Sequence, residues 1–549
     1  MPMPTFMRLL SLLALWAATL GPLSAQYLDS LASALDLIGL RFDMAALDSM
    51  QAEVRDQAEG YRTLRAEAFP NDLPLSLVFQ PPVNADRLPD SQAALDFGLP
   101  EAVAMPEDPA DLAFYPVHQL AGLLRSRQVS SVELTQLFLD RLRRYGDTLE
   151  CVITLTDSLA LAQARRADAE LAAGTYRGPL HGIPYGVKDL LAVAGYPTTW
   201  GARPYQDQTF AYTATVVNKL EEAGAVCVAK LTLGALAWGD VWYGGITKNP
   251  WNLTQGSSGS SAGSASATVA GLVPFAIGSE TWGSIVSPST RCGATGLRPT
   301  FGRVSRHGAM ALSWTMDKLG PICRNALDCA LVLAAIHGYD GHDRSVRDVP
   351  FNYDASRDPR SLRVGILREA FQPDGYNYAN DSALIARLEA EGFDLIDKRL
   401  PDSLPVGALA FILSAEAGAA FDELTRSGRD SLLVRQVKNA WPTVFRASRL
   451  IPAVEYLQAN RLRYLLTQQL NEMLAGVDVL LAPSFSQQLL MTNLSGHPCV
   501  VLPNGSYANG EGGSITLLGN HFDEANPLRL ATYIQALTPF EEEHPALFR

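Results

Sequence analysis

The residues that could do chemistry in this chain gather in one stretch rich in serine and glycine, Gln255–Thr300. A first turn, Ser258-Gly-Ser-Ser-Ala-Gly-Ser264, is followed by the apolar run Leu272–Ile277 and a second tight turn, Gly278-Ser-Glu-Thr-Trp-Gly-Ser284. Glycine lets backbone approach a ligand closely and turns N–H groups toward it. Serines at two separate turns can supply a nucleophile and a proton relay. The pattern favours acyl transfer, which needs a nucleophile, a base and donors for an oxyanion.

A candidate base lies upstream, in the segment HGIPYGVKD, where Lys188 precedes Asp189. The chain holds only seven lysines against 37 arginines, so a lysine between Gly/Pro turns and an aspartate is distinctive. Burial can drive a lysine neutral, whereas an arginine effectively stays charged. The segment predicts that Lys188 ends a short apolar strand. The alternative is a surface lysine that pairs with Asp189.

Together these motifs resemble those of the amidase signature family of Ser–Ser–Lys hydrolases, from about Leu112 to the C-terminus. The family pattern is a lysine in G-x-P-x-x-x-K-D, a serine within G-G-S-S-G-G and a nucleophile at the end of T-D-x-G-G-S. The resemblance implies that Lys188 is the base, Ser260 the bridging serine and Ser284 the nucleophile. It also implies a cis peptide bond before Ser260. We expect Ser261 to support the network by a hydrogen bond to Ser260 or its backbone.

The implied reaction is hydrolysis of a carboxylic amide through an acyl-enzyme. Neutral Lys188 takes a proton from Ser260, which takes one from Ser284 as this serine attacks the carbonyl carbon. The proton then returns through Ser260 to the leaving amine, and water releases the acid. No metal or other cofactor is expected. The oxyanion is received by successive backbone N–H groups, those of Thr281, Trp282, Gly283 and Ser284.

The second turn departs from the family pattern at several positions. Trp282 stands where glycine is usual, which keeps the backbone donors but places an indole beside the oxyanion turn. Glu280 stands where aspartate is usual, and Val286 where the family commonly carries arginine. Because Glu280 keeps its negative charge while the usual arginine is absent, we expect another cation to pair with it, and Arg291 is the candidate.

Two other functions stay open at this point. Gly259-Ser-Ser-Ala-Gly263 also matches G-x-S-x-G, the nucleophile elbow of α/β-hydrolases, which would make Ser261 the nucleophile of a serine esterase or hydrolase. Its base would be His497 or His521. The polar, turn-rich residues before the motif disfavour this alternative, because an elbow follows an apolar strand. A periplasmic solute-binding protein would also be exported, acidic and α/β, but it does not require the paired turns and Lys188.

Helical and strand patterns alternate along the remaining sequence, which predicts an α/β fold with a largely buried sheet. The resemblance implies a large mixed β-sheet covered by helices on both faces. Ser130 and Glu133 form a capping-box pattern at the start of one helix. Helices are predicted within residues 118–146, 157–173, 216–224, 382–391 and 454–474. Strands are predicted at residues 225–231, 272–277, 362–367, 393–396, 477–482, 499–503 and 515–518.

The N-terminus has the pattern of a signal peptide over residues 1–25, with the apolar run Leu9–Leu20 and a small-residue end at Leu23-Ser-Ala25. Cleavage there predicts a secreted or periplasmic protein. The alternatives are a buried first helix and an uncleaved anchor. Residues 26–111 are expected to form a helical extension and linker, followed by the catalytic domain at 112–549.

The composition of the chain limits the kinds of ligand and partner that it is expected to bind. A net charge of −13 disfavours nucleic acid, which binds a basic face. After the N-terminus no apolar run is long enough to span a bilayer. The six cysteines contain no CxxC pair, so a zinc site is disfavoured; Cys323 and Cys329 could pair, but buried free thiols are favoured. We expect a small-molecule amide or peptide amide as substrate and a monomer or homodimer as the assembly.

One branch of the family supplies ammonia to tRNA-dependent amidotransferases as a cytosolic subunit. Export and the long extension favour instead a free-standing amidase acting on aliphatic, aryl or peptide amides. Substrate choice is expected to lie within Asp340–Gln458. Two segments could line the entrance, His337–His342 and the aromatic-rich Phe371–Tyr378.

Overall fold

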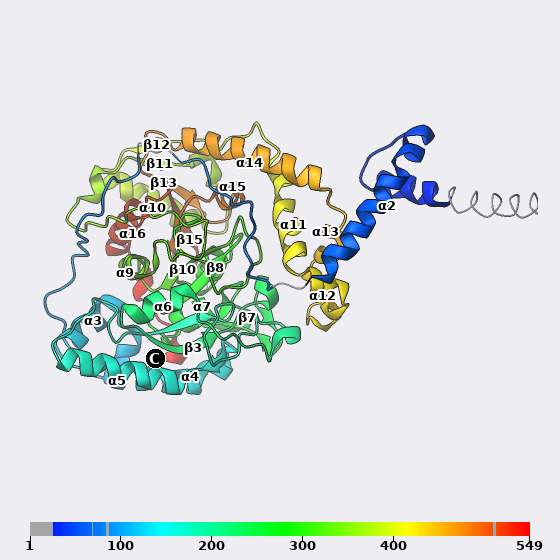
Figure 1. The fold of residues 1–549 in the computed structure, drawn as a ribbon. Helices are drawn as coiled ribbons and strands as arrows, with labels where there is room; N and C mark the ends of the chain where they lie inside the picture. Colours follow the sequence, from blue (N-terminus) through cyan, green and yellow to red (C-terminus); the bar gives the residue numbers. More distant parts are fainter. Residues whose placement is uncertain (1–25, 68–69, 84–86, 509–511) are drawn as a thin grey trace, which may run out of the picture.

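An 11-stranded mixed β-sheet forms the centre of the protein in the computed structural model, which describes residues 26–67, 70–83, 87–508 and 512–549 (Figure 1). The strand order is β1-β3-β2-β8-β10-β9-β14-β15-β13-β11-β12. Strand β2 runs parallel to β3 and β8, and β11 runs parallel to β12 and β13, while the other pairs are antiparallel. The strands are β1 Val152–Leu155, β2 Pro184–Lys188, β3 Val226–Leu231, β8 Ala276–Glu280, β9 Thr295–Arg298, β10 Lys318–Cys323, β11 Val364–Ile366, β12 Leu395–Asp397, β13 Val479–Pro483, β14 Cys499–Pro503 and β15 Ser514–Gly519.

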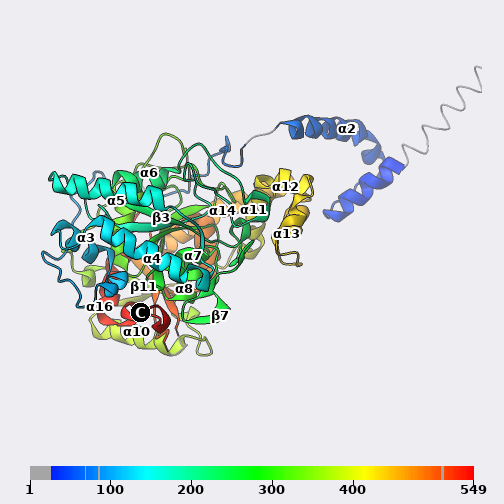
Figure 2. The ribbon, with the colours of Figure 1, turned by 90° about the horizontal axis from the view of Figure 1, so that it is seen from below.

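Helices cover both faces of the sheet, as predicted (Figures 1 and 2). Helices α9 and α16 pack on one face, and the short, small-residue helix α7 packs on the other with α8. Two small hairpins, β4 Val241–Trp242 with β5 Gly245–Ile246 and β6 Lys248–Asn249 with β7 Asn252–Gly256, lie outside the main sheet. The α-helices are α2 Met44–Ala66, α3 Val117–Arg125, α4 Ser131–Leu149, α5 Asp157–Ala172, α6 Thr215–Glu222, α7 Ala262–Val269, α8 Val286–Cys292, α9 Ala326–Ile336, α10 Tyr378–Ala390, α11 Phe411–Ala420, α12 Asp422–Arg426, α13 Trp441–Ser448, α14 Ala453–Met473, α15 Gln487–Ser495 and α16 Ala525–Leu537.

Alternation along β2 determines where its last residue points. Tyr185 and Val187 belong to the large apolar cluster that α9 and α16 also enter. Successive side chains of a strand point to opposite faces, so Lys188 is directed toward the face that carries α7. The Lys188 amine is thereby placed between two buried layers, at the end of the strand, as the sequence predicted.

Most predicted elements are confirmed to within a few residues. The capping box is present, since Ser130 accepts from the Glu133 backbone and the Glu133 side chain accepts from the Ser130 N–H. The strand predicted at residues 272–277 is wrong in its position: the strand is β8, Ala276–Glu280, although residues 272–275 are buried. Apolar residues alone could not distinguish this buried turn from the strand that follows it.

The N-terminal region is helical where the structure describes it, at residues 26–37 and in α2. Helix α2 extends away from the body beside α12 in both views (Figures 1 and 2). Its end contacts that helix, where an Arg426 Nη2 donates to the Arg65 carbonyl at 3.5 Å. The predicted signal peptide, residues 1–25, lies outside the described residues. None of the helices that the structure describes is both long and apolar enough to cross a membrane.

Candidate active site

Lys188 is fully buried at the end of β2 and is surrounded by serine hydroxyls. Its Nζ lies 2.8 Å from Ser260 Oγ, 3.0 Å from Ser261 Oγ and 2.9 Å from Ser279 Oγ. Burial holds the pKa of Lys188 well below its ordinary value, and the more distant charges of Asp317 and Glu280 oppose this shift only in part. The alternative of a surface lysine paired with Asp189 is therefore wrong.

Asp189 has a different partner, Lys230, which the sequence analysis did not single out. Lys230 Nζ lies 2.7 Å from Asp189 Oδ1, and both side chains are buried. The other oxygen of Asp189 accepts the Thr199 N–H at 2.8 Å and the Thr199 hydroxyl at 2.6 Å. Because the aspartate beside Lys188 is already paired, the Lys188 amine is left to the hydroxyl groups.

The first serine turn leads directly into helix α7. The peptide bond between Gly259 and Ser260 is cis, as the family resemblance implied. Ser261 precedes the first residue of α7, and its hydroxyl donates to the Ser279 carbonyl at 3.0 Å while accepting the Ser279 N–H at 3.1 Å. A Cβ at Gly278 would lie 2.9 Å from Ser261 Oγ, so glycine there permits this close approach. The partner predicted for Ser261 was wrong: its hydroxyl contacts Lys188 and the backbone of β8, and among the described residues it makes no hydrogen bond to Ser260.

Ser284 lies on the second turn, directly after β8. Its carbonyl accepts the Ser261 N–H at 3.1 Å, a contact that joins the two serine turns. The side chain is 9% exposed, and among the described residues its hydroxyl has no hydrogen-bond partner, Ser260 included. Gly283 adopts a φ of +83°. Within the described ranges no protein acceptor takes the backbone N–H groups of residues 281–284, which leaves four donors available beside Ser284.

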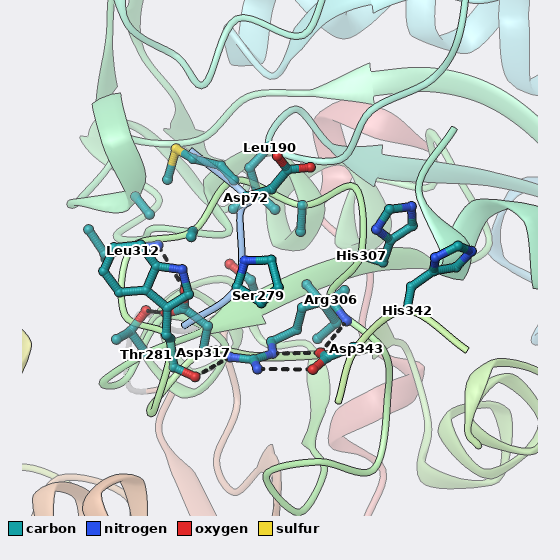
Figure 3. Close-up of a pocket in the computed structure, with 17 residues that line it drawn as sticks. Asp72, Leu190, Ser279, Thr281, Arg306, His307, Leu312, Asp317, His342 and Asp343 are labelled. Carbon is teal, nitrogen blue, oxygen red and sulfur yellow. Dashed lines mark hydrogen bonds and ion pairs between the residues drawn. The ribbon is translucent and has the colours of Figure 1, made fainter. Parts of the chain in front are cut away.

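The Thr281 side chain is tied to a buried carboxyl group. Thr281 Oγ1 donates to Asp317 Oδ1 at 2.6 Å, and Asp317 Oδ2 accepts the N–H groups of Leu312 and Ser313 at 2.8 and 2.9 Å. Burial raises the pKa of Asp317 above its ordinary value, although these hydrogen bonds act in the opposite direction. Thr281 and Asp317 both line a small pocket of about 80 Å³ (Figure 3). The first residue of the oxyanion turn is therefore held by a buried carboxyl group.

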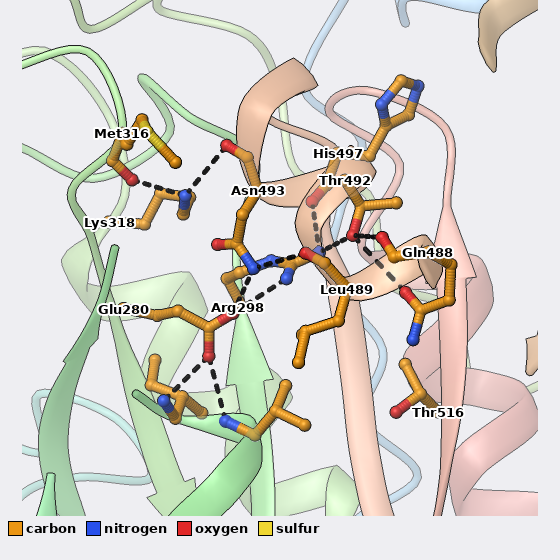
Figure 4. A network of polar contacts seen from close by, with 12 residues as sticks. Glu280, Arg298, Met316, Lys318, Gln488, Leu489, Thr492, Asn493, His497 and Thr516 are labelled. Carbon is orange, nitrogen blue, oxygen red and sulfur yellow. Dashed lines mark hydrogen bonds and ion pairs between the residues drawn. The ribbon is translucent and has the colours of Figure 1, made fainter. Parts of the chain in front are cut away.

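Glu280, at the end of β8, is the centre of a buried polar network (Figure 4). Its Oε1 accepts from Arg298 Nη1 at 2.8 Å and from Asn493 Nδ2 at 2.9 Å. Its Oε2 accepts the N–H groups of Ile285 and Val286 at 2.8 and 2.9 Å. Although burial opposes ionisation, the Arg298 charge and these hydrogen bonds lower the pKa of Glu280 to about 2.

The partner predicted for Glu280 was wrong. Arg291 is exposed, near the end of α8, whereas Arg298 is fully buried at the end of β9. Arg298 Nη2 also donates to Thr492 Oγ1 at 2.8 Å and to the His497 carbonyl at 3.0 Å. The carboxylate therefore connects the second serine turn to helix α15.

A cavity of about 640 Å³ opens beside Ser284. Its wall includes the second turn and residues of α11 and α13, and these helices lie inside the region predicted to control substrate choice. Phe485 and Leu489 also line it and lie outside that region. Neither of the two segments proposed for the entrance lines this cavity: His342 faces the small pocket of Figure 3, and Tyr376 lines a separate pocket.

The histidines proposed for an α/β-hydrolase site have other partners. His497 Nδ1 lies 2.7 Å from Ser495 Oγ, and His521 Nε2 lies 2.9 Å from the Ser495 carbonyl. In the described part of the chain neither ring hydrogen-bonds to Ser261. All six cysteines are buried free thiols, Cys323 and Cys329 included. Among the described residues, no group of three or more His, Cys, Asp or Glu side chains could hold a metal ion.

Comparison with known proteins places these features in a family. A family model described as Amidase matches residues 133–508. The chain is 33% identical over 476 residues to a glutamyl-tRNA(Gln) amidotransferase subunit of Roseiflexus castenholzii, covering 78% of this chain and 97% of the relative. It is 34% identical over 483 residues to the protein of the same name in Azoarcus sp., covering 78% and 99%.

Solved structures of amidases have a similar fold. The native peptide amidase of Stenotrophomonas maltophilia superposes with a TM-score of 0.69 at 26% identity, covering 78% of this chain and 98% of that one. A bacterial aryl acylamidase of the amidase signature family gives a TM-score of 0.70 at 20% identity, a likeness in fold, covering 78% and 97%. The chain therefore belongs to the amidase signature family of enzymes, which act on carbon–nitrogen amide bonds.

Proposed function

We propose that this protein is an exported, free-standing amidase that hydrolyses a carboxylic amide to an acid and an amine or ammonia. The observation that carries the proposal is Lys188. It is a fully buried amine with a lowered pKa, in contact with three serine hydroxyls, and within the described residues it has no carboxylate partner. A neutral amine in that position is a base at the start of a chain of hydroxyl groups.

In the proposed reaction Lys188 accepts the Ser260 proton while Ser260 accepts the proton of Ser284. Ser284 Oγ bonds to the amide carbon, and the carbonyl oxygen becomes an oxyanion held by the free N–H groups of residues 281–284. The C–N bond then breaks as the leaving nitrogen takes a proton through Ser260. Water attacks the acyl-enzyme by the same relay and restores Ser284. Catalytic hydrogen bonds often shorten only when substrate binds, so we expect the Ser284 hydroxyl to turn toward Ser260 in the complex.

A second candidate function is that of one component in a larger amidotransferase. The identity of 33–34% to relatives named as amidotransferase subunits favours it. Against it, the export proposed from residues 1–25 would separate this chain from tRNA. Amide hydrolysis by the purified chain alone supports the free-standing enzyme. Turnover that requires a second protein would support the amidotransferase component.

Export is proposed from the signal-peptide pattern of residues 1–25. N-terminal sequencing of the protein recovered from the cell envelope or the medium tests it, with Gln26 expected as the first residue. A chain that retains its initial methionine and stays in the cytosolic fraction would contradict export without affecting the chemistry.

The nucleophile is tested by labelling with a fluorophosphonate and mapping the adduct. We expect the adduct on Ser284, and we expect Ser284→Ala to lose both label and turnover while it keeps its melting temperature. Ser260→Ala should retain a weak activity, since water can replace a hydroxyl in the relay. Ser431→Ala is the control, because Ser431 is exposed and its hydroxyl bonds, among the described residues, only to the Gly428 carbonyl. A Ser261 adduct, or normal turnover by Ser284→Ala, would refute the assignment.

A further inference from the structure

The cavity beside Ser284 is lined without a single charged side chain among the described residues. Its polar side chains are neutral hydroxyl and amide groups, including those of Ser287, Ser414 and Asn439. The rest of its wall is dominated by aromatic and aliphatic side chains, chiefly Trp238, Trp282, Phe411, Leu413, Trp441 and Phe485. A charged group that binds there would be desolvated without an oppositely charged side chain in the wall to pair with.

The aromatic wall is held in place by its own packing. Trp441 is buried, and its Nε1 donates to the Leu236 carbonyl at 2.9 Å, which fixes the plane of the indole. The Trp238 ring meets Trp441 edge-on, with centroids 4.6 Å apart and planes at 71°. On the other side Phe445 stacks on Trp441 at 4.9 Å and 11°. Such a wall offers a rigid apolar face at little entropic cost.

The three carboxylates that adjoin or contact lining residues of the cavity are already engaged. Glu280 is bound by Arg298, and Asp317 is bound by Thr281 and two backbone N–H groups. Asp240 accepts the Ser258 N–H at 2.9 Å. The Arg435 guanidinium lies 6.0 Å over the Trp238 ring and lines a separate pocket of about 20 Å³. None of these groups lines the cavity itself, so a charged substrate meets no charged side chain in its wall.

We propose that the enzyme selects neutral amides with an aromatic or bulky aliphatic group and discriminates against amides that carry a carboxylate or ammonium group close to the scissile bond. The proposal rests on the amidase function proposed above and names its substrate class. Burying an unpaired charge is strongly unfavourable, whereas an aromatic group gains from burial against Trp441 and its neighbours. Free glutamine, which carries an ammonium and a carboxylate group on a carbon two methylene groups from its amide, belongs to the disfavoured class.

The test compares kcat/KM of the full chain for three amides: neutral 3-phenylpropanamide, anionic glutaramate and zwitterionic L-glutamine. We expect 3-phenylpropanamide to exceed each charged amide by roughly 100-fold or more, the scale of an unpaired buried charge. Equal rates, or a preference for glutamine or glutaramate, would overturn the proposed class. Labelling of Ser284 in the same sample would show that the amidase function survives that result. An unlabelled Ser284 with no turnover of any amide would overturn both proposals.

A cation added to the wall should shift this preference. Leu413→Arg places a positive charge in the cavity, and we expect the ratio of glutaramate to 3-phenylpropanamide turnover to rise about 10-fold. Ser414→Lys is a second variant at the neighbouring lining position, in case Leu413→Arg fails to fold. Leu432→Arg is the matched control, because Leu432 is 49% exposed and does not line the cavity. An unchanged ratio in folded Leu413→Arg and Ser414→Lys would overturn the role assigned to the uncharged wall.

Discussion

At the scale of single residues, the chemistry depends on keeping Lys188 neutral inside the fold. Burial lowers the pKa of Lys188. The carboxylate of the adjacent Asp189 pairs with Lys230 instead, so it does not stabilise the charged form of Lys188. The neutral base predominates above the lowered pKa and is lost by protonation below it. We therefore expect kcat/KM to fall as the pH drops through the pKa of Lys188, measured over about pH 5 to 9. A flat profile would mean that Lys188 is not the base.

Lys188→Arg tests the same point with a side chain that stays positively charged. Arginine keeps its charge at every accessible pH, so it cannot accept a proton from Ser260. We expect turnover to fall by about 100-fold or more, the usual contribution of a general base. Circular dichroism and the melting temperature report whether the fold tolerates the larger side chain. Substantial activity in a folded Lys188→Arg protein would show that a positive charge, not a base, is what the site requires.

Thr281 offers a residue-scale test of the oxyanion turn. Thr281→Val removes the hydroxyl that Asp317 holds at 2.6 Å and leaves the backbone N–H in place. We expect kcat to fall by about 10- to 100-fold with KM little changed, because small misplacements of a catalytic group are costly. Thr281→Ser keeps the hydroxyl and should restore most of kcat. Normal kcat in Thr281→Val together with a loss in Thr281→Ser would indicate that the methyl group, not the hydrogen bond, positions the turn.

At the scale of elements, Glu280 and Arg298 connect strands β8 and β9 to the start of α8 and to α15. Removing one member of a buried ion pair leaves an unpaired charge and costs about 3–5 kcal/mol of unfolding free energy. We expect a loss of that size in Glu280→Leu and in Arg298→Met, followed by urea denaturation. The double variant should lose much less than the sum of the two. Additive losses would show that the two side chains act independently.

The elements also show what the sequence could predict. Lys188 and both serine turns were found because each lies in a local pattern with its own Gly, Pro or Ser signature. Arg298 and Asp317 carry no such signature, because their roles depend on strand neighbours. Strand β10 lies between β8 and β9, and β9 pairs with β14, so the order across the sheet differs from the order along the chain. For Glu280, sequence proximity favoured Arg291, but that side chain is exposed.

At the scale of the whole molecule, the N-terminal extension reaches the catalytic turn through a chain of contacts. Asn71 Nδ2 donates to the carbonyls of Ala311 and Ala420 at 3.1 Å each, and Asn71 Oδ1 accepts the Ala311 N–H at 2.7 Å. The next residue, Leu312, donates its N–H to Asp317, which holds Thr281. The segment that begins at residue 70 is thus connected to the oxyanion turn, whereas α2 extends away from the body (Figure 1).

This arrangement predicts different outcomes for two truncations. A chain beginning at residue 70 should keep its kcat, because the contacts of Asn71 are intact. A chain beginning at residue 84 should lose about 10-fold or more in kcat, since Ala311 and the turn behind it lose their support. Asn71→Ala should reproduce part of that loss and lower the unfolding free energy by about 1–3 kcal/mol. Gln51→Ala on α2 is the control, because within the part of the chain that the structure describes the Gln51 amide bonds only to residues of that helix. Equal activity of the two truncated chains and of Asn71→Ala would show that the extension does not support the site.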